Sequence, residues 1–324
     1  SRQFNQLITT TDDLYFGGTL ALGGHEIKAG ADYTNNKIFN AFLQDVYGNY
    51  TFRCINSSAS VSYTSLPSGI NCATASVADN EKAVLENFER GRASAFQVQA
   101  PYAGKTLQDG VARWSIADTG LFLQDTWKVN KNLTLNAGVR MDKLSVPDKP
   151  IANAAAAAPM VAGNAATNTR QSGGFGLDNS VTVDGQSLVQ PRLGFNLRMD
   201  TEDKRRVQLR GGIGLFQGAA ATVWLSNPFS NTGVATRFVG CGGSFSACPS
   251  TDGLFNPDPN NQPTTFGGSP PAAGVDFIQP GMNQPSVWKA NLGLEAELPW
   301  YGLTAGAEWM HTKNKLGIFY RQLN

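Results

Sequence analysis

Residues 120–142 read GLFLQDTWKVNKNLTLNAGVRMD, which is two alternating segments separated by a polar turn at residues 130–132. From Leu133 to Met141 every second residue is apolar, and the residues between them are polar or glycine. Successive side chains of a β-strand point to opposite faces of the sheet. The stretch therefore predicts a β-hairpin with one face suited to lipid and the other suited to water.

The same alternation returns at residues 191–199 and 288–298, where the positions out of phase are charged nearly every time. A half-buried strand of a soluble sheet has the same period. Here, however, very long polar segments join the alternating strands, and this fits a water-filled lumen better than a compact sandwich. We therefore predict an all-β chain that forms a transmembrane antiparallel β-barrel with long extracellular loops.

The period predicts about eight strands, arranged as hairpins. The hairpins are expected near residues 13–39, 112–145, 188–222 and 286–321, with turns at residues 23–25, 130–132, 201–206 and 299–302. Long irregular stretches separate them, near residues 40–113, 145–187 and 219–285. Outer-membrane barrels have short periplasmic turns and longer extracellular loops, so we expect the short turns to face the periplasm.

The long stretches are not uniform in composition. Residues 151–168 are rich in alanine and carry no charge, and residues 251–281 are crowded with Pro, Asn and Gly, so both are expected to be irregular. Residues 81–90, EKAVLENFER, fit either a short helix or the start of an added strand that runs through Gln99. The loop aromatic residues either form a ligand platform or pack the loops themselves; they are Tyr47, Tyr50, Phe52, Phe229, Phe238, Phe245 and Phe255.

The composition excludes some classes of protein. The chain is 41% hydrophobic and 16% charged with a formal net charge of +1, which argues against a disordered chain and gives nucleic acid no bulk attraction. No window approaches the roughly 18 consecutive apolar residues that predict a transmembrane helix. Any membrane crossing must therefore use strands, which have to close into a barrel because lipid offers no partner for an open edge.

The four cysteines, Cys54, Cys72, Cys241 and Cys248, all fall in the predicted outer loops. Their even number and their proximity in sequence favour two loop disulfides, Cys54 with Cys72 and Cys241 with Cys248, in an oxidising compartment. Four cysteines allow three connectivities, so this pairing is a preference.

Catalytic and metal-binding motifs are poor. The only histidines, His25 and His311, have no nucleophile signature beside them, and no CxxC pair accompanies them. The run GGIGLFQG from Gly211 lacks the register of a phosphate-binding loop. We therefore predict no enzyme activity, no catalytic residue, no metal site and no cofactor.

Several segments resemble the barrel of a TonB-dependent outer-membrane receptor, particularly the OmpA-related, Oar-like branch. They are GLFLQDTWKVNKNLTLNAGVRMD, QPRLGFNLRMD, RVQLRGGIGLFQG and HEIKAGADYTNN. The segment VWKANLGLEAELPWYGLTAGAEWMHTKN is similar to a further hairpin of the same branch. The resemblance covers all the predicted hairpins and none of the loops.

The resemblance implies a bacterial outer-membrane barrel of about 22 strands around an N-terminal plug domain. It also implies a TonB box that couples transport of an unknown small substrate, bound at the outer loops, to the inner-membrane proton gradient. The implied partners are outer-membrane lipid, the plug of the same parent protein and the TonB complex. Because the chain shows no signal peptide, plug or TonB box, we expect it to be an internal portion of the barrel.

Two sets of residues receive roles on this interpretation. The charged residues expected to line the lumen, where they contact the plug or a polar substrate, are Lys28, Arg140, Arg192, Arg198, Arg210, Glu295 and Glu297. The aromatic residues expected to anchor the barrel at the membrane interface, near the turns, are Trp127, Trp288, Trp300, Tyr301 and Trp309. The alternative for any single one of these charges is that it belongs to a solvated ladder of cross-strand pairs and has no specific role.

Two other classes of protein remain open. The first is a complete small eight-stranded barrel that acts as an adhesin or a loop-presenting structural protein, because about eight strands permit closure. The second is a secreted β-sandwich that binds a partner through its long loops. Further strands or a plug would exclude the first, and a lipid-facing aromatic girdle argues against the second.

Overall fold

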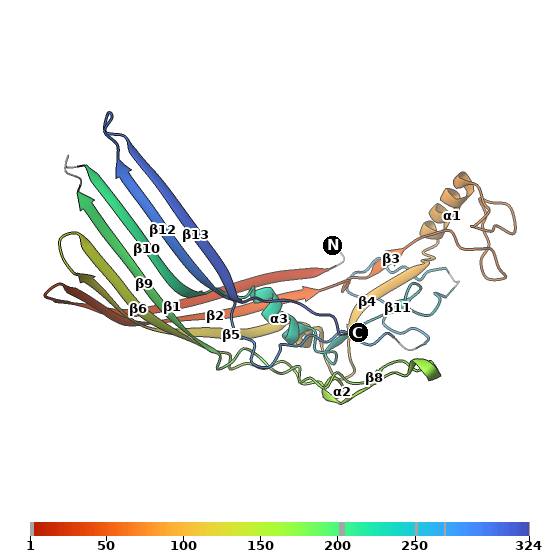
Figure 1. Cartoon of the computed structure of the whole chain (residues 1–324). Helices are drawn as coiled ribbons and strands as arrows, with labels where there is room; N and C mark the ends of the chain where they lie inside the picture. The colour runs from red at the N-terminus through yellow and green to blue at the C-terminus, as the bar shows by residue number, and fades with distance from the viewer. Residues whose placement is uncertain (1–2, 201–204, 250–251, 269, 324) are drawn as a thin grey trace.

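A computed structural model describes residues 3–200, 205–249, 252–268 and 270–323 of the chain. Its main feature is one curved sheet of eight strands in the order β1-β2-β5-β6-β9-β10-β12-β13, in which every neighbouring pair is antiparallel (Figure 1). The strands are β1 (Phe4–Leu22), β2 (His25–Leu43), β5 (Ala112–Lys128), β6 (Leu133–Ser145), β9 (Ser187–Asp200), β10 (Arg206–Gln217), β12 (Ser286–Glu297) and β13 (Thr304–Leu316). The predicted all-β antiparallel architecture is confirmed.

Short turns join the strands at one end of the sheet, and long connections join them at the other (Figure 1). The β1–β2 turn uses Gly23 at a φ of 58°, and the β12–β13 turn uses Tyr301 and Gly302 at 53° and 66°. Such positive φ values favour glycine in tight turns. The predicted turn at residues 201–206 lies mostly outside the described residues.

Some predicted strand ends were wrong. The first hairpin begins at Phe4 and ends at Leu43, because main-chain pairing continues through polar residues that show no alternation. The third hairpin ends earlier than predicted, at Gln217, and a helix begins at Thr222. In the fourth hairpin, β13 ends at Leu316 and not near residue 321.

The eight strands do not close on themselves. Within the described residues β1 pairs only with β2, and β13 pairs only with β12. The alternative of a complete eight-stranded barrel requires β1 to pair with β13, so this structure does not support it. The secreted sandwich needs two sheets packed face to face, whereas these strands form a single wall.

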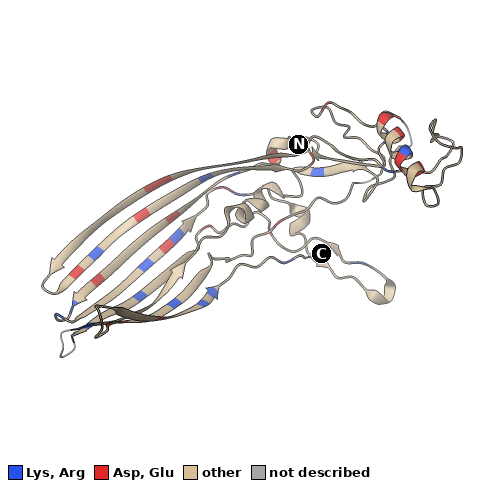
Figure 2. Ribbon diagram, turned by 90° about the horizontal axis from the view of Figure 1, so that it is seen from above, with Lys and Arg blue, Asp and Glu red and all other residues tan. Residues whose placement is uncertain are grey.

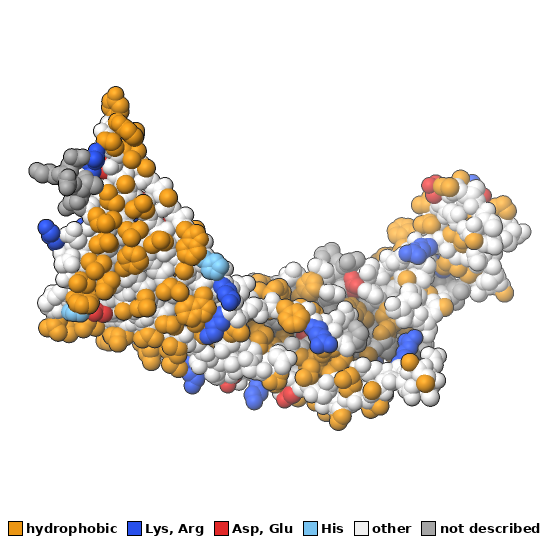
Figure 3. Space-filling model, viewed as in Figure 1, with side chains coloured by type: hydrophobic (Ala, Val, Ile, Leu, Met, Phe, Trp, Pro, Cys, Tyr) orange, Lys and Arg blue, Asp and Glu red, His pale blue; other side chains and the backbone are white. Residues whose placement is uncertain are grey.

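The wall has two faces of opposite character. We call the face that carries Arg140 the polar face and the face that carries Val139 the apolar face. Large apolar side chains on the apolar face are exposed, with Phe16 at 82%, Leu14 at 69% and Leu193 at 61% of full exposure. Figure 3 shows hydrophobic side chains gathered over these strands, and Figure 2 shows charged residues recurring along them. An exposed apolar band opposite a polar face is the pattern of a wall between lipid and water.

The long connections are not irregular throughout. The strands β3 (Asn49–Thr51), β4 (Ala95–Pro101) and β11 (Thr236–Cys241) form a second sheet in the order β11-β4-β3. Helix α1 (Val77–Glu89) precedes β4, so residues 81–89 are helical and an added strand also follows through Gln99. The α1 helix begins at Ser76, whose hydroxyl accepts a hydrogen bond from the Asp79 amide at 3.1 Å.

The remaining loop elements are short. They are α2 (Ala154–Ala157), β7 (Met160–Val161), β8 (Ser172–Gly173), α3 (Thr222–Ser230) and the 3₁₀ turns Leu107–Gly110 and Ala165–Thr167. The alanine-rich stretch is therefore partly helical. None of the helices among the described residues has both the length and the apolar character needed to cross a membrane.

Helix α3 packs onto the polar face at the loop end of the wall. Phe229 of α3 stacks on Trp114 of β5, with 5.2 Å between the ring centroids. The Trp114 indole Nε1 also donates a hydrogen bond to Ser226 Oγ at 2.9 Å. Ile38, Ile116 and other apolar residues complete this core. The polar face therefore ends in an apolar cluster that one of the long connections covers.

Candidate functional site on the polar face of the wall

The register of the strands places the predicted lumen charges on the polar face. Lys28 lies opposite Gln124, Gln124 opposite Gly138, and Gly138 opposite Arg192. Directly opposed residues of neighbouring strands share a face of the sheet. The same rule, applied along the other pairs, puts these charged residues on that face: Lys28, Arg140, Arg192, Arg198, Arg210, Glu295 and Glu297.

Arg140 is the centre of a charge network on this face. Its Nη1 and Nη2 atoms contact the two carboxylate oxygens of Asp32 at 2.6 and 2.7 Å, and its Nε donates to Asp142 at 2.9 Å. The guanidinium reaches Asp32 because it lies over Gly120, where a side chain would occupy the same space. Paired, charge-assisted contacts of this kind fix geometry as well as adding energy.

The network continues across the sheet. Gln190, which is 2% exposed, donates to Asp142 and accepts a hydrogen bond from the Gln217 main-chain amide at 2.8 Å. The Gln217 side chain donates to Asp118 at 3.2 Å. The bonds therefore link β2, β6, β9, β10 and β5 near the loop end of the wall. Sequence reasoning gave no role to Asp118, Gln190 or Gln217, because their partners are distant in sequence.

Three cations lie beside this network without a carboxylate partner among the described residues. Arg192 and Lys289 lie over the Phe216 ring, at 4.6 and 6.0 Å from its centroid, and Lys28 lies 6.0 Å from the centre of the Phe122 ring. Contacts of this kind hold the aliphatic stems of cationic side chains while their charged groups stay in water.

A second group of polar residues lies closer to the short turns. Arg210 and Glu295 form an ion pair at 3.0 Å, with each side chain 44% exposed. Glu297 accepts a hydrogen bond from the Arg206 main-chain amide at 3.3 Å, and the Arg198 side chain is exposed. This group is solvated, as expected for an ordinary cross-strand ladder.

The chain's membership of a protein family follows from a sequence comparison. Residues 3–308 match the family described as the outer membrane beta barrel domain. The chain belongs to this family. Its wall is therefore part of a barrel in the bacterial outer membrane, with the apolar face toward lipid. No curated protein matches the sequence.

Two solved structures share a distant likeness with this barrel domain. One is the copper transporter OprC, with a TM-score of 0.39 and 12% identity over 92% of this chain and 29% of that chain. The other is the closed form of the ferric-catecholate import receptor Fiu from E. coli K12, with a TM-score of 0.34 and 14% identity over 95% of this chain and 31% of that chain. The barrel domain thus spans under a third of the length of either structure.

The aromatic residues predicted as interface anchors are not all at one level of the barrel wall. Trp127 lies at the short-turn end of β5, and Trp300 and Tyr301 lie in the β12–β13 turn. Trp288, by contrast, is near the loop end of β12, and Trp309 is well inside β13. The prediction that all five lie near the turns was wrong, because alternation determines the face of a strand residue but not its depth.

The outer loops of the barrel form a packed unit of their own. Disulfides join Cys54 to Cys72 and Cys241 to Cys248, the pairings that proximity in sequence favours. Tyr50, Phe52 and Phe255 lie against one another with ring centroids between 5.0 and 6.4 Å apart, so these three residues pack the loops. Burial raises the pKa of the Tyr50 phenol above its usual value.

Charged groups in the loops are also held in place. Glu86 of α1 is 5% exposed and accepts hydrogen bonds from the Thr64 amide, the Ser65 amide and the Ser65 hydroxyl at 2.6 to 2.9 Å. Burial alone raises the pKa of Glu86, but these donors and the nearby Arg90 outweigh it and lower the pKa to about 2. Arg92, which is 2% exposed, binds Asp252 at 2.6 Å.

The metal-binding residue types, including the two histidines, do not gather into a metal site in the part of the chain that the structure describes. No group of three His, Cys, Asp or Glu side chains has the geometry to hold a metal ion there. His25 contacts Asp125 at 2.7 Å and stacks on Trp127, and His311 stacks on Trp309. The candidate site is therefore the polar face of the wall and its charged residues.

Proposed function

We propose that this chain is a sector of the wall of a TonB-dependent outer-membrane receptor. In this proposal the outer loops bind a small substrate, a plug domain of the same parent protein fills the lumen, and the TonB complex drives passage along the polar face. The proposal assigns no catalysis to the chain. The observation that carries it is that most of the wall charges lie on one face, opposite a face that is mainly apolar.

The charges of the polar face divide into two roles. Arg140 is fully engaged with Asp32 and Asp142, so it stiffens the wall across neighbouring strands. Lys28, Arg192 and Lys289 lack such partners among the described residues, so they are the groups that contact the plug or a polar substrate. A rigid wall with a few charges that lack ion-pair partners suits a surface that must bind and release the plug or a substrate repeatedly.

The outer loops support the capture step. Their disulfides, packed aromatic residues and buried Arg92 make them ordered before any ligand arrives. A preordered loop loses less conformational entropy when it binds. These packed and cross-linked loops differ from flexible linkers, and such ordered loops are suited to binding a substrate.

Two neighbouring residues allow a direct test, because Arg192 and Leu193 are adjacent in β9 and lie on opposite faces. A photoreactive amino acid would be placed at position 192 or at position 193 of the full-length protein in living cells. We expect position 192 to crosslink to a segment of the same protein outside the wall and position 193 to crosslink to lipid.

The TonB step needs its own readout. Removal of TonB from the cells should change the crosslinking yield at position 192 and leave the yield at position 193 unchanged. Crosslinks from position 192 to lipid alone would contradict the proposed lumen, and crosslinks to the plug that do not respond to TonB would contradict energised transport.

A further inference from the structure

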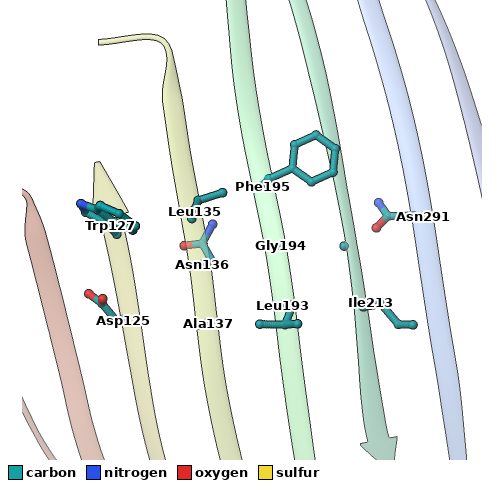
Figure 4. Close-up of a pocket in the computed structure, with 11 residues that line it drawn as sticks. Asp125, Trp127, Leu135, Asn136, Ala137, Leu193, Gly194, Phe195, Ile213 and Asn291 are labelled. Carbon is teal, nitrogen blue, oxygen red and sulfur yellow. The ribbon is translucent and has the colours of Figure 1, made fainter. Parts of the chain in front are cut away.

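A groove of about 510 Å³ crosses the apolar face of β5, β6, β9 and β10 beside the β5–β6 turn (Figure 4). The groove is lined on one side by Trp127 and Leu135 and on the other side by Leu193, Phe195 and Ile213. Its lining is mostly apolar. These residues belong to two adjacent rows of the register, Trp127-Leu135-Phe195 and Asp125-Ala137-Leu193-Ile213.

The groove exists because two large rings lean away from each other. The Trp127 ring leans toward β2, where it stacks on His25 with 5.2 Å between centroids and approaches Gly24. The Phe195 ring lies over Gly211 of β10, at 2.8 Å from where a Cβ atom of that residue would be. Ala137, between the two rings, is too small to fill the space. Gly211 and Ala137 therefore leave the groove open between the two rings.

The position of the groove indicates what fills it. The apolar face of an outer-membrane barrel is in contact with lipid. Leu193 is 61% exposed and Ile213 50% exposed, so both contact acyl chains in the membrane. A mostly apolar groove on this face therefore fits one acyl chain.

A carboxylate lies at the rim of this apolar groove. The Asp125 side chain is 35% exposed, and its Oδ2 atom contacts His25 Nδ1 at 2.7 Å. Its Oδ1 atom is buried without a hydrogen-bond partner, and no Lys or Arg forms an ion pair with Asp125 among the described residues. A charge on the lipid face is costly except near the head groups, where a complementary charge can offset the cost.

We propose that the groove is a binding site for a phospholipid with a primary amine in its head group. One acyl chain lies between Trp127 and Phe195, and the ammonium group contacts Asp125. Lys131 in the adjoining turn is exposed and attracts the phosphate that every phospholipid carries, so it does not discriminate between head groups. The proposal depends on the membrane location of the wall and not on transport.

The test is native mass spectrometry of the full-length protein in nanodiscs that contain equal amounts of phosphatidylethanolamine and phosphatidylglycerol. We expect the lipid that stays bound to be enriched in phosphatidylethanolamine by about two- to fivefold, as for an exposed ion pair. Asp125→Asn should return the ratio to that supplied. Asp12→Asn is the matched control, because Asp12 pairs with Lys37 at 3.0 Å on the same face but outside the groove.

A second pair of variants tests the groove itself. Ala137→Phe fills the floor of the groove and should abolish lipid retention, whereas Ala29→Phe places the same ring on the apolar face of β2 and should not. Photoactivatable acyl chains on wild-type protein should label peptides that contain Leu193 or Phe195. An unselective lipid ratio, a preference for phosphatidylglycerol, or labelling spread evenly over the wall would overturn the proposal.

Discussion

The wall exposes Phe16 to 82% and Leu14 to 69%, whereas the three-stranded loop sheet leaves Phe96 at 1% and Val98 at 2%. The wall obtains its stability from main-chain pairing, polar-face bonds and lipid. The loop region obtains it from a small apolar core, two disulfides and buried charges. One chain therefore contains a membrane-type region and a soluble-type region, and each should respond to a different perturbation.

The largest effect should come from breaking the charge network of the wall. Arg140→Met leaves Asp32 and Asp142 without their cation, and removal of one partner from a buried pair costs about 3 kcal/mol or more. Urea unfolding of the barrel in vesicles, followed by tryptophan fluorescence, should show this loss of stability, while the loops keep their protection from protease.

A matched variant separates this effect from simple loss of charge. Arg210→Met removes a cation from the same face, but its pair with Glu295 is 44% exposed on both sides, so it should cost less than about 1 kcal/mol. Equal losses for Arg140→Met and Arg210→Met would show that the network does not brace the wall.

The next effect should be confined to the loops. Replacement of Cys54 and Cys72 by serine opens a link between residues separated by 18 positions, which in the chain-entropy account costs about 3 kcal/mol. Hydrogen exchange should become faster in α1 and β3 and stay unchanged in the wall strands. The Cys241–Cys248 link spans 7 positions, and its loss should cost somewhat less, about 2.5 kcal/mol. Faster exchange throughout the wall would show that the two regions are not separate.

A further effect in the loops should be the acid response of α1. The pKa of Glu86 is about 2 in the folded loops against an ordinary value of 4.5. A lowered pKa means that Glu86 stabilises the loops above about pH 4.5 and that this contribution is lost as the pH falls toward 2. Pepsin cleavage beside Leu85 and Phe88, normalised to an unstructured peptide, should rise across this window.

Glu86→Gln provides the control for this pH response. The variant cannot gain a proton at position 86, so pepsin cleavage of α1 should begin from a higher level at pH 4.5 and change less down to pH 2. An identical pH profile for wild type and variant would assign the acid response to other groups.

The sequence predicted the wall better than the loops for a physical reason. A strand between lipid and water must alternate apolar and polar side chains. The face on which each side chain of residues 133–142 and 288–298 lies can therefore be predicted from the sequence. The polar beginning of β1, from Phe4 to Asp12, lacks that contrast and escaped prediction. The short strand β11 escaped as well, and β4 was only one of two alternatives, because these strands pair across more than a hundred residues.

The candidate site was also predicted only in part from the sequence. The face of Arg140 was readable from its phase, but its bidentate contact with Asp32 joins residues 108 positions apart. The depth of Trp288 and Trp309 depends on strand register, which alternation does not supply. The groove beside Trp127 depends on the tilt of two rings, and no spacing rule in the sequence contains that information.

The central claim is that these eight strands are one sector of a larger plugged wall. The most direct measurement is the density of the native full-length particle, extracted from outer membranes in mild detergent. We expect β1 and β13 each to pair with a further strand, and ordered protein to lie against Lys28 and Arg192 on the polar face. A small barrel closed by pairing of β1 with β13, with no protein inside, would contradict the claim.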